Sequence, residues 1–80
     1  MAGIDSIIEK MRRNPKGIRF KELCRVCDYY FGKERSRGTS HRIYKVPWIY
    51  PPIVNIQSFK EKAKDYQVRQ VLNAIDQKDA

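Results

Sequence analysis

The chain has 80 residues, of which 17 are lysine or arginine and 9 are aspartate or glutamate, so its formal net charge is +8. This length suffices for a single domain with a thin core and excludes a deep substrate chamber. The positive charge favours a polyanionic partner, whether nucleic acid or acidic protein. The sequence contains no apolar run long enough to span a membrane and no signal-peptide core, so we expect a cytoplasmic protein that does not bind membranes.

Two amphipathic helices are predicted in the first part of the chain. The first runs from Ile4 to about Asn14, where Pro15 and Gly17 interrupt it. The second is expected from about Arg19 to about Tyr29, before Gly32. In each helix the apolar residues recur at i, i+3, i+4 and i+7, namely Ile4, Ile7, Ile8 and Met11, then Phe20, Leu23, Cys24 and Cys27.

Three short strands are predicted next, because β-branched and aromatic residues become frequent and the apolar period becomes two. They are expected at about residues 32–37, 40–46 and 53–57, with Gly38-Thr39 as the turn between the first two. The prolines in 47–52 make that segment a loop or sheet edge, because proline lacks the amide hydrogen that a strand ladder needs. The charged segment 58–62 is expected to be a solvated loop.

A last helix is predicted over about residues 64–76, with an apolar stripe of Val68, Val71, Leu72 and Ile75. The element order α-α-β-β-β-α predicts a two-layer α+β domain spanning 1–80, in which residues 1–17 form an added helix and break. A three-stranded antiparallel sheet should carry the helices on one face and leave the other open.

Strand alternation predicts which side chains occupy each face of the sheet. Tyr44 and Val46 on one strand, with Val54 and Ile56 on the next, should pack under the helices. His41 and Lys45 should then face solvent, near Asn55 and Gln57. The cations expected to contact a polyanion in this part of the chain are Lys33, Arg35, Arg37, Arg42 and Lys45. Tyr44 is expected in the core, whereas Trp48 and Tyr50 could stack on bases, pin the proline-rich loop or anchor a protein partner.

His41 is the only histidine and the strongest candidate for proton transfer. On a basic surface it could take the proton from a ribose 2′-hydroxyl, with nearby cations stabilising the phosphate. The residue pattern alone favours a surface histidine without a role. Cys24-Arg25-Val26-Cys27 could be half of a zinc site or a redox pair, but both cysteines fit the apolar stripe and are expected to be core thiols. The acids are scattered, so we predict no metal site and no cofactor.

The segment Gly38-Thr39-Ser40-His41-Arg42-Ile43-Tyr44 resembles the glycine, small residue, histidine and aromatic pattern of HicA toxins. The strand Ile53-Val54-Asn55-Ile56 and the helix segment 66–72 resemble the longer HicA-like proteins in order and spacing. The resemblance covers residues from about 20 to about 75. The helix 4–14 and the segment 47–52 are extra or longer relative to the shortest members.

This resemblance implies a fold like that of double-stranded-RNA-binding domains and the activity of a metal-independent mRNA interferase. His41 would be the catalytic residue, with Gly38 as the turn glycine and Ser40 beside it in the RNA-binding segment. A HicB-like antitoxin would bind over the toxin, which would contact DNA only through that partner. The alternatives are a non-catalytic RNA-binding module, an interaction protein that meets an acidic partner, and a thiol redox protein.

Overall fold

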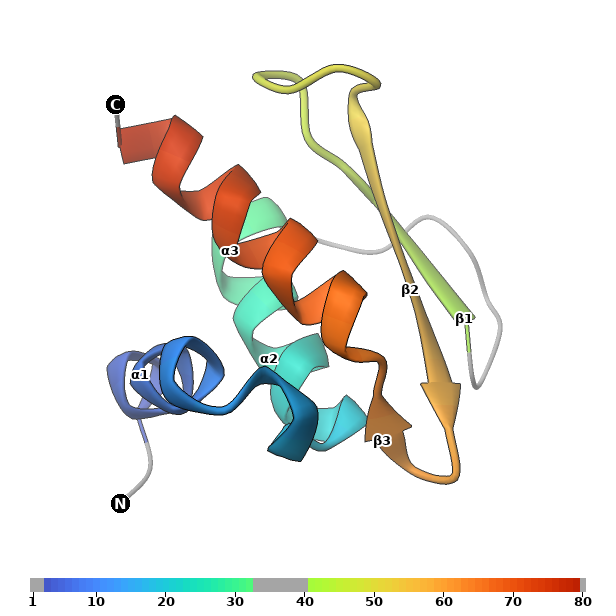
Figure 1. Cartoon of the computed structure of the whole chain (residues 1–80). Helices are drawn as coiled ribbons and strands as arrows, with labels where there is room; N and C mark the ends of the chain where they lie inside the picture. Colours follow the sequence, from blue (N-terminus) through green and yellow to red (C-terminus); the bar gives the residue numbers. More distant parts are fainter. Residues whose placement is uncertain (1–2, 33–40, 80) are drawn as a thin grey trace.

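The computed structural model describes residues 3–32 and 41–79. Within them, three helices and a three-stranded antiparallel sheet follow one another in the order α-α-β-β-β-α (Figure 1). The α+β class and the element order expected from the sequence are therefore confirmed. One strand of the sheet, however, is formed by residues that were predicted to be a loop.

The helices begin and end close to the predicted positions. α1 is Ile4–Arg13, a short 3-10 turn η1 follows at Pro15–Gly17, and α2 is Phe20–Phe31. α3 is Asp65–Asp79, with Asp65 in its first turn, where a carboxylate interacts favourably with the helix dipole. α2 ends at Gly32, whose φ of 88° lies in the left-handed region that suits glycine.

Two of the predicted strands are present. β1 is His41–Lys45 and β2 is Ile53–Phe59, and they pair antiparallel with His41 opposite Gln57 and Lys45 opposite Ile53. The strand predicted at 32–37 lies outside the described residues except for Gly32, and so does the predicted turn at 38–39.

The third strand of the sheet corrects the prediction of a solvated loop at 58–62. β2 continues to Phe59, and β3, Lys62–Ala63, pairs antiparallel with it, so that Phe59 lies opposite Lys62. Lys60 and Glu61 form the two-residue turn with φ of 51° and 67°. Such turns normally contain asparagine or glycine, which adopt positive φ readily. A Lys-Glu turn carries no such signal, which is why the sequence pattern missed this hairpin.

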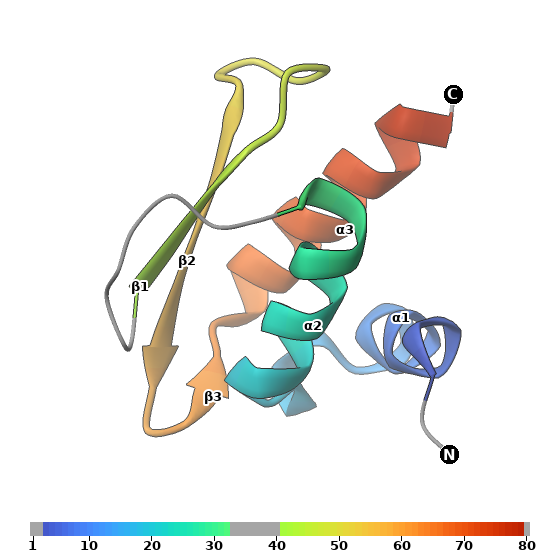
Figure 2. The same ribbon diagram turned by 180° about the vertical axis from the view of Figure 1, so that it is seen from behind.

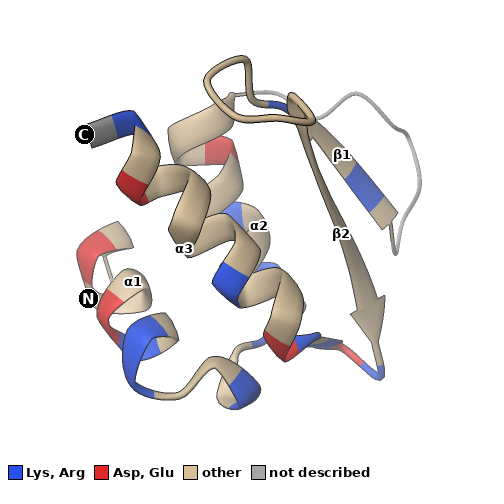
Figure 3. Cartoon of the chain, turned by 45° about the horizontal axis from the view of Figure 1, so that its top comes forward, with Lys and Arg blue, Asp and Glu red and all other residues tan. Residues whose placement is uncertain are grey.

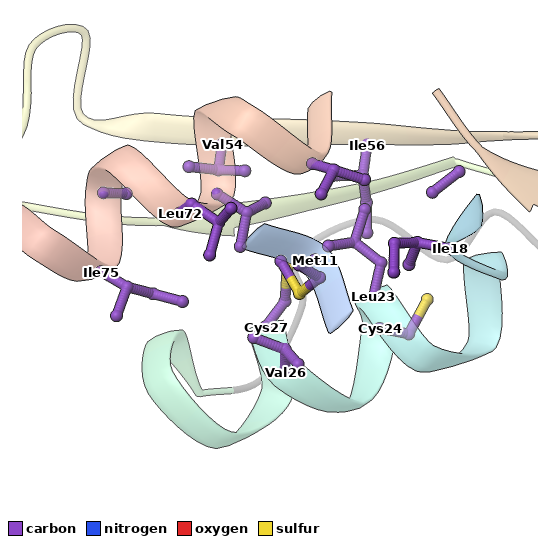
Figure 4. Packing of buried hydrophobic residues seen from close by; sticks show 14 of the residues in the cluster. Met11, Ile18, Leu23, Cys24, Val26, Cys27, Val54, Ile56, Leu72 and Ile75 are labelled. Carbon is purple, nitrogen blue, oxygen red and sulfur yellow. The ribbon is translucent and has the colours of Figure 1, made fainter. Parts of the chain in front are cut away.

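The helices and the sheet form two layers. α2 and α3 cover one face of the sheet, and α1 packs against α2 and α3 on the side away from the strands (Figures 1 and 2). One cluster of buried side chains includes residues from all three helices and all three strands, and Figure 4 shows part of it. The apolar stripes predicted for the helices thus form the core.

A backbone connection joins the β3 edge to the start of α2. The amide of Phe20 donates to the carbonyl of Glu61 over 3.0 Å, and the amide of Ala63 donates to the carbonyl of Ile18 over 2.9 Å. Both bonds hold the β2–β3 hairpin against the segment between η1 and α2. This end of the sheet is therefore fixed relative to the helical layer.

The side chain of Met11 is fully buried, so replacing it tests whether α1 is an integral part of the core. We expect Met11→Ala to lower the free energy of unfolding by about 2–5 kcal/mol, since the change leaves a cavity. Chemical denaturation measures this value. The exposed Gln70 provides a control, and Gln70→Ala should change the free energy by no more than about 0.5 kcal/mol. A Met11→Ala effect as small as the control would show that α1 does not pack as described.

Candidate nucleic-acid interface

The outer face of the sheet carries the polar groups that alternation predicted. Asn55, Gln57 and Lys45 are exposed, and His41 is half-buried at the start of β1. On the inner face Tyr44, Val46, Val54 and Ile56 are fully buried. The structure therefore brings His41, Asn55 and Gln57 together on the open face, as expected from the sequence.

His41 and Asn55 are joined by a hydrogen bond between Nε2 of the imidazole and Oδ1 of the amide. An amide oxygen only accepts, so Nε2 carries the hydrogen in this arrangement. In the neutral ring Nδ1 is then the nitrogen with a lone pair that can accept a proton. The contact is diagonal across the strand pair, because His41 lies directly opposite Gln57 and Asn55 lies opposite Ile43. Asn55 thus orients the ring on the outer face of the sheet.

Lys45 shares the outer face with His41 but lies four residues further along β1. At the rise of an antiparallel strand their Cα atoms are about 13 Å apart. The ammonium of Lys45 can therefore meet a neighbouring part of a bound polyanion rather than a group held at the imidazole. The other predicted contacts on this side, Lys33, Arg35, Arg37, Gly38 and Ser40, lie outside the described residues.

Arg42 projects to the opposite face from His41. Its Nη1 donates to the Tyr44 hydroxyl over 3.3 Å and lies 3.7 Å from Oδ1 of Asp28. The same Tyr44 hydroxyl donates to Oδ1 of Asp28 over 2.7 Å. Burial raises the pKa of Tyr44 well above its usual value. This group of three side chains ties β1 to α2, and the structure does not bring Arg42 together with His41 and Lys45.

A second basic region borders Arg42, and its other cations were not among the predicted contacts. A groove of about 590 Å³ lies between α2 and the strands, and four cations line it together with Asp28 and Glu61, namely Arg19, Lys21, Arg25 and Arg42. The spacing of Lys21 and Arg25 by four residues places both on one side of α2. That spacing is visible in the sequence and could have indicated a basic side of the helix beside its apolar stripe.

Trp48 pins the proline-rich loop to the helical layer. Its Nε1 donates to the carbonyl of Ala74 over 2.7 Å, its ring packs against Phe31, and the Lys78 ammonium lies 4.9 Å from the ring centroid. Of the roles considered for Trp48, pinning the loop is the one observed. Tyr50 is 95% exposed at the far end of this loop.

Both cysteines are buried thiols in the core, as predicted. Burial raises the pKa of Cys27 well above its ordinary value, which is opposite to the shift of a nucleophilic thiol. In the parts of the chain that the structure describes, no group of three or more His, Cys, Asp or Glu side chains is placed to hold a metal ion. Across residues 3–32 and 41–79, no helix is long and apolar enough to cross a membrane.

Comparisons with known proteins identify no relative. No protein-family model, curated protein or solved structure matches this chain.

The raised pKa of the buried Tyr44 predicts that the folded protein becomes less stable at alkaline pH. Its raised pKa means that, above about pH 10, the unfolded chain loses the tyrosine proton while the folded chain keeps it. Stability from this group is therefore complete below about pH 10 and falls by about 1.4 kcal/mol per pH unit above that value. Tyr44→Phe removes this contribution and also the bond to Asp28, so the variant is less stable near neutral pH.

Denaturant titrations from about pH 8 to about pH 11 measure the effect. The free energies of unfolding of the wild type and Tyr44→Phe should converge as the pH rises. Parallel profiles would contradict the assignment of Tyr44 as a buried neutral phenol.

Proposed function

We propose that this chain is a HicA-type RNA endonuclease in which His41 transfers a proton. The observation that carries the proposal is the outer sheet face, where the imidazole is held by Asn55 on an open surface of a strongly basic protein. A shallow, open site suits a polymer that lies across the surface, and a surface of this charge attracts RNA. The resemblance around Gly38 to Tyr44 supplies the catalytic role for the histidine.

The chemistry follows from the oriented ring. Nδ1 of His41 takes the proton of a ribose 2′-hydroxyl, and the 2′-oxygen attacks the adjacent phosphorus. The bond from phosphorus to the 5′-oxygen breaks, leaving a 2′,3′-cyclic phosphate on one fragment. The departing 5′-oxygen receives a proton from water or from a lysine and becomes a hydroxyl. Cations close to the phosphate stabilise the charge that develops during the attack.

A protein partner that covers the outer face of the sheet would control such an activity. We propose a HicB-like antitoxin that binds over the toxin and shields His41 from RNA. Contact with DNA would come only through that partner. The alternative of a non-catalytic RNA-binding module remains an outcome of the test below.

His41→Ala should abolish growth arrest in cells that express the chain and slow RNA cleavage by the purified protein by about 10²- to 10⁴-fold. Binding of RNA should persist, because the cations are unchanged. The measurement is the rate of cleavage of a labelled RNA, together with its affinity.

The control is Asn73→Ala, which changes an exposed residue of α3 remote from the sheet face. Full cleavage by His41→Ala would refute the catalytic assignment. RNA binding without cleavage by the wild type would instead favour the binding module.

Asn55 is proposed as a positioning residue that acts through His41. Asn55→Ala should lower the cleavage rate by roughly ten- to hundredfold, because the ring loses its orientation. In the His41→Ala background the same change should have no further effect, since both residues serve one step. Independent, multiplicative losses in the double variant would show that Asn55 acts separately from the imidazole.

A further inference from the structure

Phe59 is a large apolar side chain left 60% exposed on the outer face of the sheet. Single exposed aromatic residues are common on protein surfaces and need no function. The position of Phe59 distinguishes it, because β2 alternation places it on the same face as Asn55 and Gln57. Gln57 is the direct cross-strand partner of His41, and the Cα of Phe59 lies two residues, or about 7 Å, beyond that of Gln57 along β2.

Cations flank the ring of Phe59. Lys62 is its direct cross-strand partner and therefore projects from the same face. The ammonium of Lys60 lies 5.6 Å from the ring centroid. Figure 3 shows basic segments on either side of an acidic one where β2 turns into β3. The acid of the turn, Glu61, borders the groove on the inner side instead.

The turn that presents these side chains is held firmly. Lys60 and Glu61 both adopt positive φ, a conformation that is unfavourable for residues other than glycine. The backbone bond from Phe20 to the Glu61 carbonyl fixes the turn against the start of α2. The aromatic ring and its two lysines thus lie at an end of the sheet that is hydrogen-bonded to the helical layer, on the same sheet face as His41.

We propose that Phe59 is a base-stacking subsite for single-stranded RNA, with Lys60 and Lys62 contacting the phosphates on either side of the stacked nucleotide. This inference rests on the proposed function and adds to it the class of substrate. An exposed ring can stack only on a base whose face is free, and bases inside a duplex are already stacked on their neighbours. The cation–π contact of Lys60 is weak at an exposed site, so its ammonium can move to a phosphate when a base arrives.

A base stacked on Phe59 also positions the RNA relative to the imidazole of His41. Because Phe59 lies beyond Gln57 on the same face, a nucleotide stacked there would direct the adjoining part of the RNA along the outer face toward His41. The chain would therefore cleave unpaired RNA and spare duplex RNA, even though its fold is expected to resemble that of duplex-binding domains.

Fluorescence anisotropy tests the proposal with the non-cleaving His41→Ala protein, a short labelled single-stranded RNA of mixed sequence and its blunt duplex. Adding Phe59→Ala should raise the Kd for the single strand roughly tenfold and leave the Kd for the duplex nearly unchanged. Phe59→Trp should restore the affinity. Lys62→Ala should make the affinity for the single strand fall less steeply as the salt concentration rises, by the amount expected for about one lost phosphate contact.

Tyr29→Ala is the matched control, because Tyr29 is an exposed aromatic residue of α2, in the helical layer rather than on the sheet. It should change neither affinity. Equal loss of single-strand and duplex binding in Phe59→Ala, or a loss no larger than in Tyr29→Ala, would overturn the stacking subsite while leaving RNA cleavage in place. Displacement of the RNA by polyglutamate as readily as by unlabelled RNA would assign this face to an acidic protein. A protein that binds no RNA at all would overturn the proposed function itself.

Discussion

The pairing of β1 with β2 in one register is the constraint on which the site depends. With His41 opposite Gln57, every apolar side chain of both strands that faces the helices is buried, and the imidazole meets Asn55 on the open face. A slip by one residue would exchange the two faces, exposing the core side chains and burying the polar ones. The free energy of burying the apolar residues therefore also fixes the position of the candidate catalytic group.

Contacts from the helical layer reinforce this register. The Tyr44 hydroxyl binds Asp28 of α2, and the buried Gln67 of α3 accepts a hydrogen bond from the amide of Gln57 over 2.8 Å. The second bond attaches the first turn of α3 to the strand position opposite His41. The outer face can carry polar groups because contacts between the inner face and the helical layer set its geometry.

Sequence patterns predicted the parts of this architecture that follow from apolar periodicity. The stripes of α1, α2 and α3 and the alternation of Tyr44, Val46, Val54 and Ile56 each have one favourable way to be buried. The β2–β3 hairpin was missed because Lys60 and Glu61 adopt positive φ only under tertiary constraint, through the bond from Phe20. The pairing of His41 with Asn55 could be anticipated as proximity but not as a hydrogen bond, because alternation gives faces and not register. The groove lined by α2 needed the packed structure, since its cations come from two segments far apart in the sequence, 19–25 and β1.

The chemistry of the RNA ends tests the central claim most directly. Purified protein should cleave single-stranded RNA in the presence of EDTA, leaving 2′,3′-cyclic phosphate and 5′-hydroxyl ends. A strand with 2′-deoxyribose at the cleavage position should resist. Cleavage that requires a divalent cation, or products with 5′-phosphate ends, would contradict the assignment of His41 as the group that activates the ribose hydroxyl.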